Sequence, residues 1–436
     1  MTRLLLLVFS IFISFASYAQ PSHFNLSNGM EVVAIPNDKV PAVSHMVWYK
    51  VGAFDEPEGK SGIAHFLEHL MFKGTPRYPK GQFSKLIAKA GGNDNAFTSQ
   101  DFTAYYQNIS KHKLSQVMDM ESDRMQNLTF DNEEVLKERD VILEERSMRV
   151  DNKPAAILSE KMRKALYQEH PYGTPVIGWR SEMEELSTDD AKDWYNNYYT
   201  PANAILVVSG DITADELKPL AEKHYGKIKS GKEHKHAHYT KPLPASQKKI
   251  VVKDEKVLKP EWDKLYLAPS QNTQGSEHCY ALAVLSYIMA GSDTSRMYQD
   301  LVVEKQLAAS VSSSYNDLHI GNSIFSLSAI PAEGKKIQDV EDAISKHIAD
   351  FIDDEVTKDE LRRAKSALVA EIVYAKEDLK TMAYLYGQAM ATGAGFDYME
   401  KWSDNIEAVT AEDIQKAAQY VFNENYAVTG YLEGVK

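Results

Sequence analysis

The chain has 436 residues, of which 43% are apolar and 25% are charged, the composition of an ordinary globular protein. This length predicts two or three domains with a sizeable core. The formal net charge of −13 comes without a basic stripe that could neutralise phosphates, which argues against a nucleic-acid partner.

Residues 1–19 have the pattern of a cleavable signal peptide. A short positive start precedes an apolar run over 4–16, and Ser17 and Ala19 supply the small residues that place cleavage after Ala19. This run is too short to span a bilayer, and no other apolar run approaches the length that is needed. We therefore expect an exported protein without a membrane span. Cys279 is the single cysteine, which excludes an intramolecular disulfide and predicts a buried thiol. An exported chain without disulfides fits a bacterial periplasm.

The most informative stretch follows the first predicted strands, which surround an Asn-Gly turn at 28–29 and cover 43–51. It reads H-x-x-E-H, with His65, Glu68 and His69 in the inverse order of the H-E-x-x-H zinc-protease motif. Residues four apart share one face of a helix, so both imidazoles can reach one metal ion. Glu68 lies close enough to reach a water molecule on that metal.

The surrounding residues predict that this motif lies on a helix. Ser61 is a candidate N-cap, and Gly74 followed by Pro76 ends the helix. The pattern alone arises by chance in roughly a few per cent of chains of this length. The alternative is a pair of structural histidines with satisfied hydrogen bonds. Two histidines and a carboxylate on an apolar helix need partners, however, and a metal is the most economical one.

The rest of the first half supplies a candidate third ligand. A catalytic zinc commonly has three protein ligands and one open position. Glu138 and Glu145 lie two turns apart on one face of a predicted helix, and this helix is the best source of that ligand. The other elements expected in this half are helices over 80–89 and 113–128 and strands over 95–99, 102–106 and 204–210.

A linker is predicted over residues 231–247, between a first domain at 20–230 and a second at 248–436. It is rich in Lys, His, Pro and Ser. Its histidines follow a period of two, which is compatible with a metal-binding tract, although a solvated linker is the favoured interpretation. These histidines are His234, His236 and His238.

The second half repeats the pattern of the first at a spacing of roughly 220 residues. The helix over 358–374 resembles the one over 132–150, and the helix and strand over 410–431 resemble those over 188–210. This duplication predicts an α+β fold of two homologous α/β halves, each a sheet packed with helices, joined by the linker. The second half has no counterpart of the metal motif, so one half is built for chemistry and the other is not.

Taken together, these motifs resemble those of the pitrilysin/insulinase family of zinc peptidases. Within it, the chain is similar to the single-length subunits represented by the mitochondrial processing peptidase. The resemblance covers nearly the whole mature chain and is carried by residues 62–75, Gly91-Gly92, 95–98, 103–105, 138–145 and 199–204.

The resemblance implies specific roles for the motif residues. It implies that His65, His69 and Glu145 bind one zinc ion per chain, that Glu68 is the general base, and that Glu138 is a supporting carboxylate. In the alternative interpretation, Glu138 is an exposed side chain that forms an ion pair with a neighbouring cation on its own helix. The implied reaction is hydrolysis of short or unfolded peptides by a Glu-activated, zinc-bound water.

The resemblance also implies how substrate is held, and one departure from the family pattern follows. The strand that starts at Asn95 and Ala96 resembles the edge strand that pairs with an extended peptide, although an ordinary sheet strand has the same residues.

Val302 and Ala309 stand where family members carry an Arg and a Tyr that contact substrate. We therefore expect the zinc-bearing subunit of a heterodimer whose homologous partner supplies that pair. The alternatives are a non-catalytic peptide-binding or complex-stabilising subunit and a homodimeric peptidase.

Overall fold

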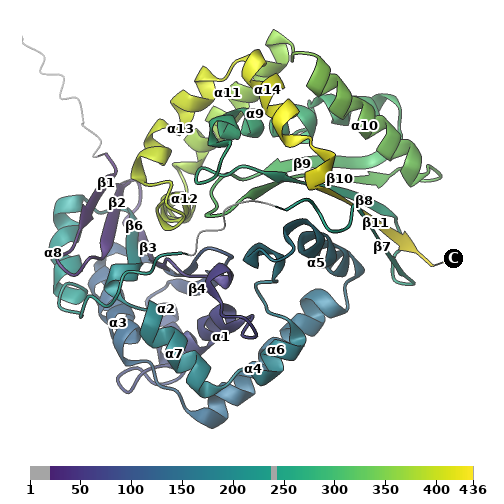
Figure 1. Cartoon of the computed structure of the whole chain (residues 1–436). Coiled ribbons are helices and arrows are strands. Elements are labelled where there is room, and N and C mark those ends of the chain that lie inside the picture. The colour runs from purple at the N-terminus through teal and green to yellow at the C-terminus, as the bar shows by residue number, and fades with distance from the viewer. Residues whose placement is uncertain (1–19, 237–242, 436) are drawn as a thin grey trace, which may run out of the picture.

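The computed structural model describes residues 20–236 and 243–435, which form two α/β halves, the first purple to teal and the second green to yellow (Figure 1). The predicted signal peptide at 1–19 and His238 lie outside the described residues. Each half is a mixed sheet with helices against it, so the predicted α+β fold of two similar halves is confirmed.

The first sheet has six strands in the order β1-β2-β6-β3-β5-β4. Its β2–β6 pair is parallel and the other pairs are antiparallel. Central strand β6 is buried along its whole length, as its apolar run predicts. The strands are β1 (Ser22–Asn25), β2 (Glu31–Pro36), β3 (Ala42–Tyr49), β4 (Asn93–Thr98), β5 (Thr103–Ser110) and β6 (Ala204–Gly210). The helices of this half are α1 (Ile63–Leu70), α2 (Gln82–Lys89), α3 (Leu114–Asn127), α4 (Asn132–Arg146), α6 (Arg180–Glu185), α7 (Thr188–Tyr198) and α8 (Ala214–His224).

The second sheet repeats this topology in the order β7-β11-β8-β10-β9. Its β7–β11 pair is parallel, as β2–β6 is in the first sheet, and β9 takes the edge place of β4. The strands are β7 (Lys249–Asp254), β8 (Glu261–Ala268), β9 (Ala308–Tyr315), β10 (Ser323–Pro331) and β11 (Ala427–Gly434). The helices are α9 (Cys279–Ala290), α10 (Ile337–Asp353), α11 (Lys358–Ala375), α13 (Phe396–Ala408) and α14 (Ala411–Val421).

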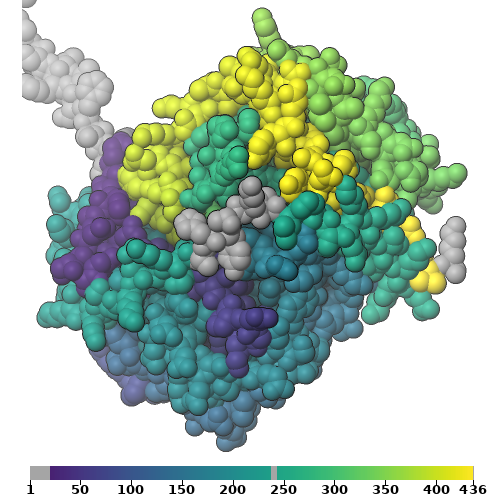
Figure 2. All heavy atoms as spheres, viewed as in Figure 1, coloured from purple at the N-terminus to yellow at the C-terminus, as the bar shows by residue number. Residues whose placement is uncertain are grey.

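Two further helices each pack against the sheet of the other half. Helix α5 (Pro154–Tyr167) of the first half packs against β7 and β11 of the second sheet, and α12 (Leu379–Ala391) packs against β3 and β6 of the first. Glycines allow both close approaches: a Cβ at Gly387 would lie 2.1 Å from Cε2 of Trp48, and one at Gly430 would lie 2.2 Å from Sδ of Met162. The second half therefore rests directly on the first (Figure 2).

Two expectations about the chain as a whole can be compared with these elements. In the part of the chain that is described, no helix combines the length and apolarity needed to cross a bilayer. Cys279 is buried, as expected, and burial raises the pKa of its thiol to about 12. Its sulfur lies 3.2 Å from the Tyr315 hydroxyl oxygen, and with this raised pKa the thiol is a protonated, structural group at neutral pH.

Candidate metal centre

Helix α1 is held at its N-terminus by a carboxylate rather than by the predicted Ser61 cap. The N-cap is Gly62, and Glu56 accepts the backbone N–H groups of Gly62 at 2.9 Å and Ala64 at 3.0 Å. Ser61 instead accepts the N–H of Trp179 at 2.8 Å. Gly62 has φ +89 and lies against a neighbouring backbone and side chain, so a Cβ would not fit there. A buried carboxylate on free N–H groups fixes the direction of the motif helix.

Three predicted ligand atoms meet between α1 and α4. Nε2 of His69 lies 3.3 Å from Oε2 of Glu145, and Nε2 of His65 lies 3.8 Å from the same oxygen. One donor atom from each of the three residues can be chosen so that all lie within 4.8 Å of one another. The other carboxylate oxygen of Glu145, Oε1, is held at 2.9 Å by the Arg149 guanidinium, which leaves Oε2 directed at the histidines.

This donor set fits a zinc ion. Oε2 of Glu145 is buried and has no hydrogen-bond partner among the described residues, which is costly for a carboxylate unless a cation lies beside it. Burial, followed by the charge of His69, lowers the pKa of His65 to about 3, so its imidazole is neutral and keeps a lone pair for a metal. Two imidazole nitrogens and one carboxylate oxygen match the ligands of catalytic zinc sites that keep one open position.

Glu68 lies beside this donor set on α1. Its Oε2 accepts a hydrogen bond from the Thr98 hydroxyl at 2.5 Å, at the end of β4. Burial raises the pKa of Glu68 above its usual range, and the Thr98 hydrogen bond opposes that shift only in part. A carboxyl group with a raised pKa is a better proton acceptor at neutral pH than an exposed one.

Glu138 contacts the predicted ligand His69 instead of a cation on its own helix. Its Oε1 lies 3.0 Å from Nδ1 of His69, and its Oε2 accepts from the Lys73 ammonium. Burial would raise the pKa of Glu138, but the hydrogen bonds with His69 and Lys73 outweigh it and the pKa is lowered. Lys137 pairs with Glu133 and is not its partner. The carboxylate is thus placed to hold the His69 ring with Nε2 facing Glu145. Sequence reasoning did not find Lys73, although it lies four residues after His69.

The predicted substrate residues lie on the edge of the first sheet. In β4, Asn95 and Ala96 pair with β5 only, and Asn95 is exposed. The N–H of Ala96 is accepted at 2.9 Å by the side-chain oxygen of Asn95 and not by β5. This N–H therefore points away from the sheet, where an added strand could use it.

The two positions at which the resemblance expects an Arg and a Tyr lie in the second half, close in the chain to Arg296 and Tyr315. Val302 is half-buried against the second core, and Ala309 is exposed on edge strand β9. Arg296 forms a two-pronged ion pair with Glu360, with both N–O distances 2.8 Å. The Tyr315 hydroxyl donates to the carbonyl of Pro269 at 2.7 Å. The Arg296 and Tyr315 side chains are thus engaged within the second half.

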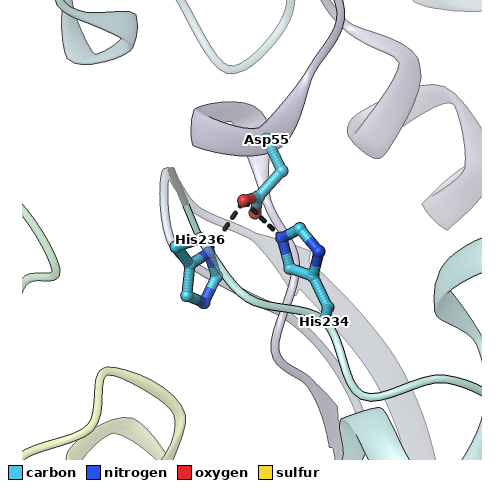
Figure 3. Close-up of side chains that lie close together, drawn as sticks. All are labelled: Asp55, His234 and His236. Carbon is cyan, nitrogen blue, oxygen red and sulfur yellow. Dashed lines mark hydrogen bonds and ion pairs between the residues drawn. The ribbon is translucent and has the colours of Figure 1, made fainter. Parts of the chain in front are cut away.

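A second group of potential ligands lies at the start of the linker. His234 and His236 each direct a nitrogen at Asp55, as Figure 3 shows. Their side chains are only 18% and 20% exposed, so the expectation of solvated linker histidines is wrong for these two residues. The period-two spacing was the signal in the sequence, but Asp55 is too distant in the chain to be linked to it.

Comparisons with known proteins find family matches along most of the chain. Residues 32–179 match the family described as insulinase (peptidase family M16), and residues 185–368 match the peptidase M16 inactive domain. The zinc protease PqqE of Helicobacter pylori is 30% identical over 95% of this chain and 93% of its own length. The uncharacterized zinc protease YmxG of Bacillus subtilis is 27% identical over 93% of this chain and 96% of its own. A crystal structure of a protease from Helicobacter pylori superposes with a TM-score of 0.88 at 28% identity, over 95% of this chain and 100% of that one.

Proposed function

This chain belongs to the insulinase family of peptidases (peptidase family M16), and from that membership we propose that it is a zinc-dependent endopeptidase. His65, His69 and Glu145 are its catalytic zinc ligands, and together they hold one ion. The observation that carries the proposal is the buried Oε2 of Glu145, which faces Nε2 of both histidines and lacks a hydrogen-bond partner among the described residues. Relatives named as zinc proteases support the same metal.

The residues around this donor set supply proton transfer. When bound there, zinc lowers the pKa of a water molecule and polarises the carbonyl of the peptide bond to be cleaved. Glu68 takes the proton of the attacking water at its carboxylate and returns it to the nitrogen of the leaving amine. Thr98 orients that carboxylate through its hydrogen bond to Oε2. A subunit that only binds peptides has no need for a buried base at this position, which disfavours the non-catalytic alternative.

The edge of β4 is the proposed binding site for an extended peptide. A peptide carbonyl would replace the Asn95 side-chain oxygen as the acceptor of the Ala96 N–H and add a strand beside β4. Because Thr98 of the same strand contacts Glu68, a peptide paired along β4 passes the base. Backbone pairing selects extended chains, so short or unfolded peptides are the proposed substrates.

The proposed assembly and location rest on two further observations. Neither Val302 nor Ala309 can donate a side-chain hydrogen bond, and Arg296 and Tyr315 are engaged elsewhere. A homologous partner that supplies an Arg and a Tyr would complete the site, which makes this chain the catalytic subunit of a heterodimer. The signal-peptide pattern at 1–19, together with a single cysteine, supports export to a bacterial periplasm.

The decisive experiment compares the wild type with Glu68→Gln for zinc content and for cleavage of unstructured fluorogenic peptides. We expect the variant to keep its zinc and lose at least about a hundredfold in kcat, since a general base commonly contributes that much. Glu144→Gln is the matched control, because Glu144 is exposed on α4. A Glu68→Gln protein that keeps both zinc and activity would refute the role of Glu68.

A further inference from the structure

We propose that Asp55, His234 and His236 form a second metal site, suited to zinc, that fastens the start of the linker to the zinc-binding half. Asp55 ends the short 3-10 turn η1 (Ala53–Asp55), which follows β3 and precedes α1. The two histidines come from residues 231–236, which have no regular secondary structure. The site joins segments about 180 residues apart in the chain.

The three side chains already converge on one point. Nε2 of His234 and Nδ1 of His236 each lie 2.7 Å from the same oxygen, Oδ1 of Asp55 (Figure 3). The imidazole rings are nearly perpendicular, with centroids 4.8 Å apart. The second carboxylate oxygen, Oδ2, accepts the N–H of Gly52 at 3.0 Å, which fixes the carboxylate group.

The balance of charge favours a cation over a set of hydrogen bonds. The Asp55 side chain is only 2% exposed, so its negative charge is buried. A buried charge is costly when it has no counter-charge beside it. A divalent ion would bind each neutral imidazole through the nitrogen that faces Oδ1, with the imidazole proton on the other ring nitrogen, and its charge would offset that of the carboxylate. Two nitrogens and one oxygen are ligands that zinc prefers.

Only a small movement converts this arrangement into a coordination sphere. Ligand atoms that share a tetrahedral zinc at about 2.1 Å lie about 3.4 Å from each other. Each nitrogen would therefore move away from Oδ1 by roughly 0.7 Å. The irregular backbone of 231–236 permits this shift, whereas Asp55 is held by its turn.

The position of the site indicates what the metal would do. His234 and His236 line a cavity of about 940 Å³ together with residues of both halves, among them Lys50 and Asn322. Asp55 immediately precedes Glu56, whose carboxylate holds the N-terminus of α1. A metal here would fix the linker beside the loop that carries the motif helix, with its remaining coordination position available to water from the cavity.

Zinc stoichiometry of the full mature chain tests this proposal independently of catalysis. After equilibration with Zn²⁺ and removal of free metal, the wild type should bind one more ion per chain than His234→Gln/His236→Gln. The double variant should also lose part of the rise in melting temperature that Zn²⁺ gives the wild type. His65→Ala/His69→Ala should lose a different ion and keep this one, so failure of the catalytic site is distinguished from failure of the second.

His112→Gln serves as the matched control, because His112 is exposed and lies outside both groups. It should bind as many ions as the wild type. The proposal is overturned if His234→Gln/His236→Gln binds as many zinc ions as the wild type, whatever the peptidase activity. Circular dichroism of the double variant separates loss of the ion from loss of the fold.

Discussion

Glu138 holds Nδ1 of His69 at 3.0 Å, on the side of the ring opposite the Nε2 that faces Glu145. This contact orients the ring before any metal binds. We predict that Glu138→Ala weakens zinc binding by about 10- to 100-fold, the usual effect of losing such an outer partner. Competition with a zinc chelator measures the change. Glu133→Ala, an exposed change on the first turn of α4, should leave the affinity unaltered, and an unchanged Glu138→Ala protein would rule out this role.

Glu145 and Glu144 provide a sharper pair of variants on the same helix. Glu145→Gln replaces a proposed ligand oxygen by a neutral amide. Zinc affinity should therefore fall by more than roughly 100-fold, the largest usual loss when a residue that only hydrogen-bonds a ligand is removed. Glu144→Gln removes an exposed carboxylate one position away and should have no effect. Metal content after dialysis measures both. Equal zinc retention by the two variants would show that the third ligand lies elsewhere.

The packing of α12 against the first sheet should be sensitive to one methyl group added at Gly387. In Gly387→Ala the new Cβ would lie 2.1 Å from the buried ring of Trp48, so helix and sheet must separate. Overpacking of this kind costs about 1–3 kcal/mol of unfolding free energy. Denaturant unfolding measures it, with Thr381→Ala, an exposed change on the same helix, as the control. A Gly387→Ala protein as stable as the wild type would show that the two halves readily adjust.

His45 should make stability depend on pH. It is fully buried, with Nδ1 2.7 Å from Gln107 Oε1 and Nε2 3.1 Å from the Tyr225 hydroxyl, and burial lowers its pKa to about 4. The unfolded chain takes up this proton near pH 6.5 and the folded one only near pH 4. The contribution of His45 to stability is therefore complete above about pH 6.5 and is lost as the pH falls to 4, by up to about 1.4 kcal/mol per pH unit.

Denaturant unfolding of His45→Gln at several pH values isolates this contribution. The variant should lose stability less steeply than the wild type between pH 6.5 and 4, because glutamine does not titrate. His112→Gln changes an exposed histidine and should keep the wild-type slope. Identical slopes for His45→Gln and the wild type would contradict the assignment.

The heterodimer proposal predicts how activity depends on a partner. Alone, the chain should bind zinc but cleave peptides slowly, because Val302 and Ala309 leave its second half without hydrogen-bond donors at these positions. A homologue that carries an Arg and a Tyr there should raise kcat/KM at least about tenfold, as a transition-state contact of 1.4 kcal/mol would. Size-exclusion chromatography should show a mixed dimer. Full activity of the isolated chain as a homodimer would contradict the proposal.

Local sequence patterns determined the parts of this protein that depend on short-range geometry. Helix periodicity alone places His65 and His69 on one face, and it places Glu138 and Glu145 on one face of α4. The repeated order of helices and strands predicted the two halves, which the matching sheets confirm. The choice of Glu145 as the third ligand needed the resemblance to a known family, because periodicity left both carboxylates open.

Contacts between distant segments were decided only by the tertiary structure. The packing of α5 and of α12 against the sheet of the other half, and the meeting of Asp55 with His234 and His236, have no local signal. Each joins an ordinary helix, turn or linker residue to a partner that packing alone brings near. A sequence pattern records which face of an element is apolar or polar, but not which distant element covers that face.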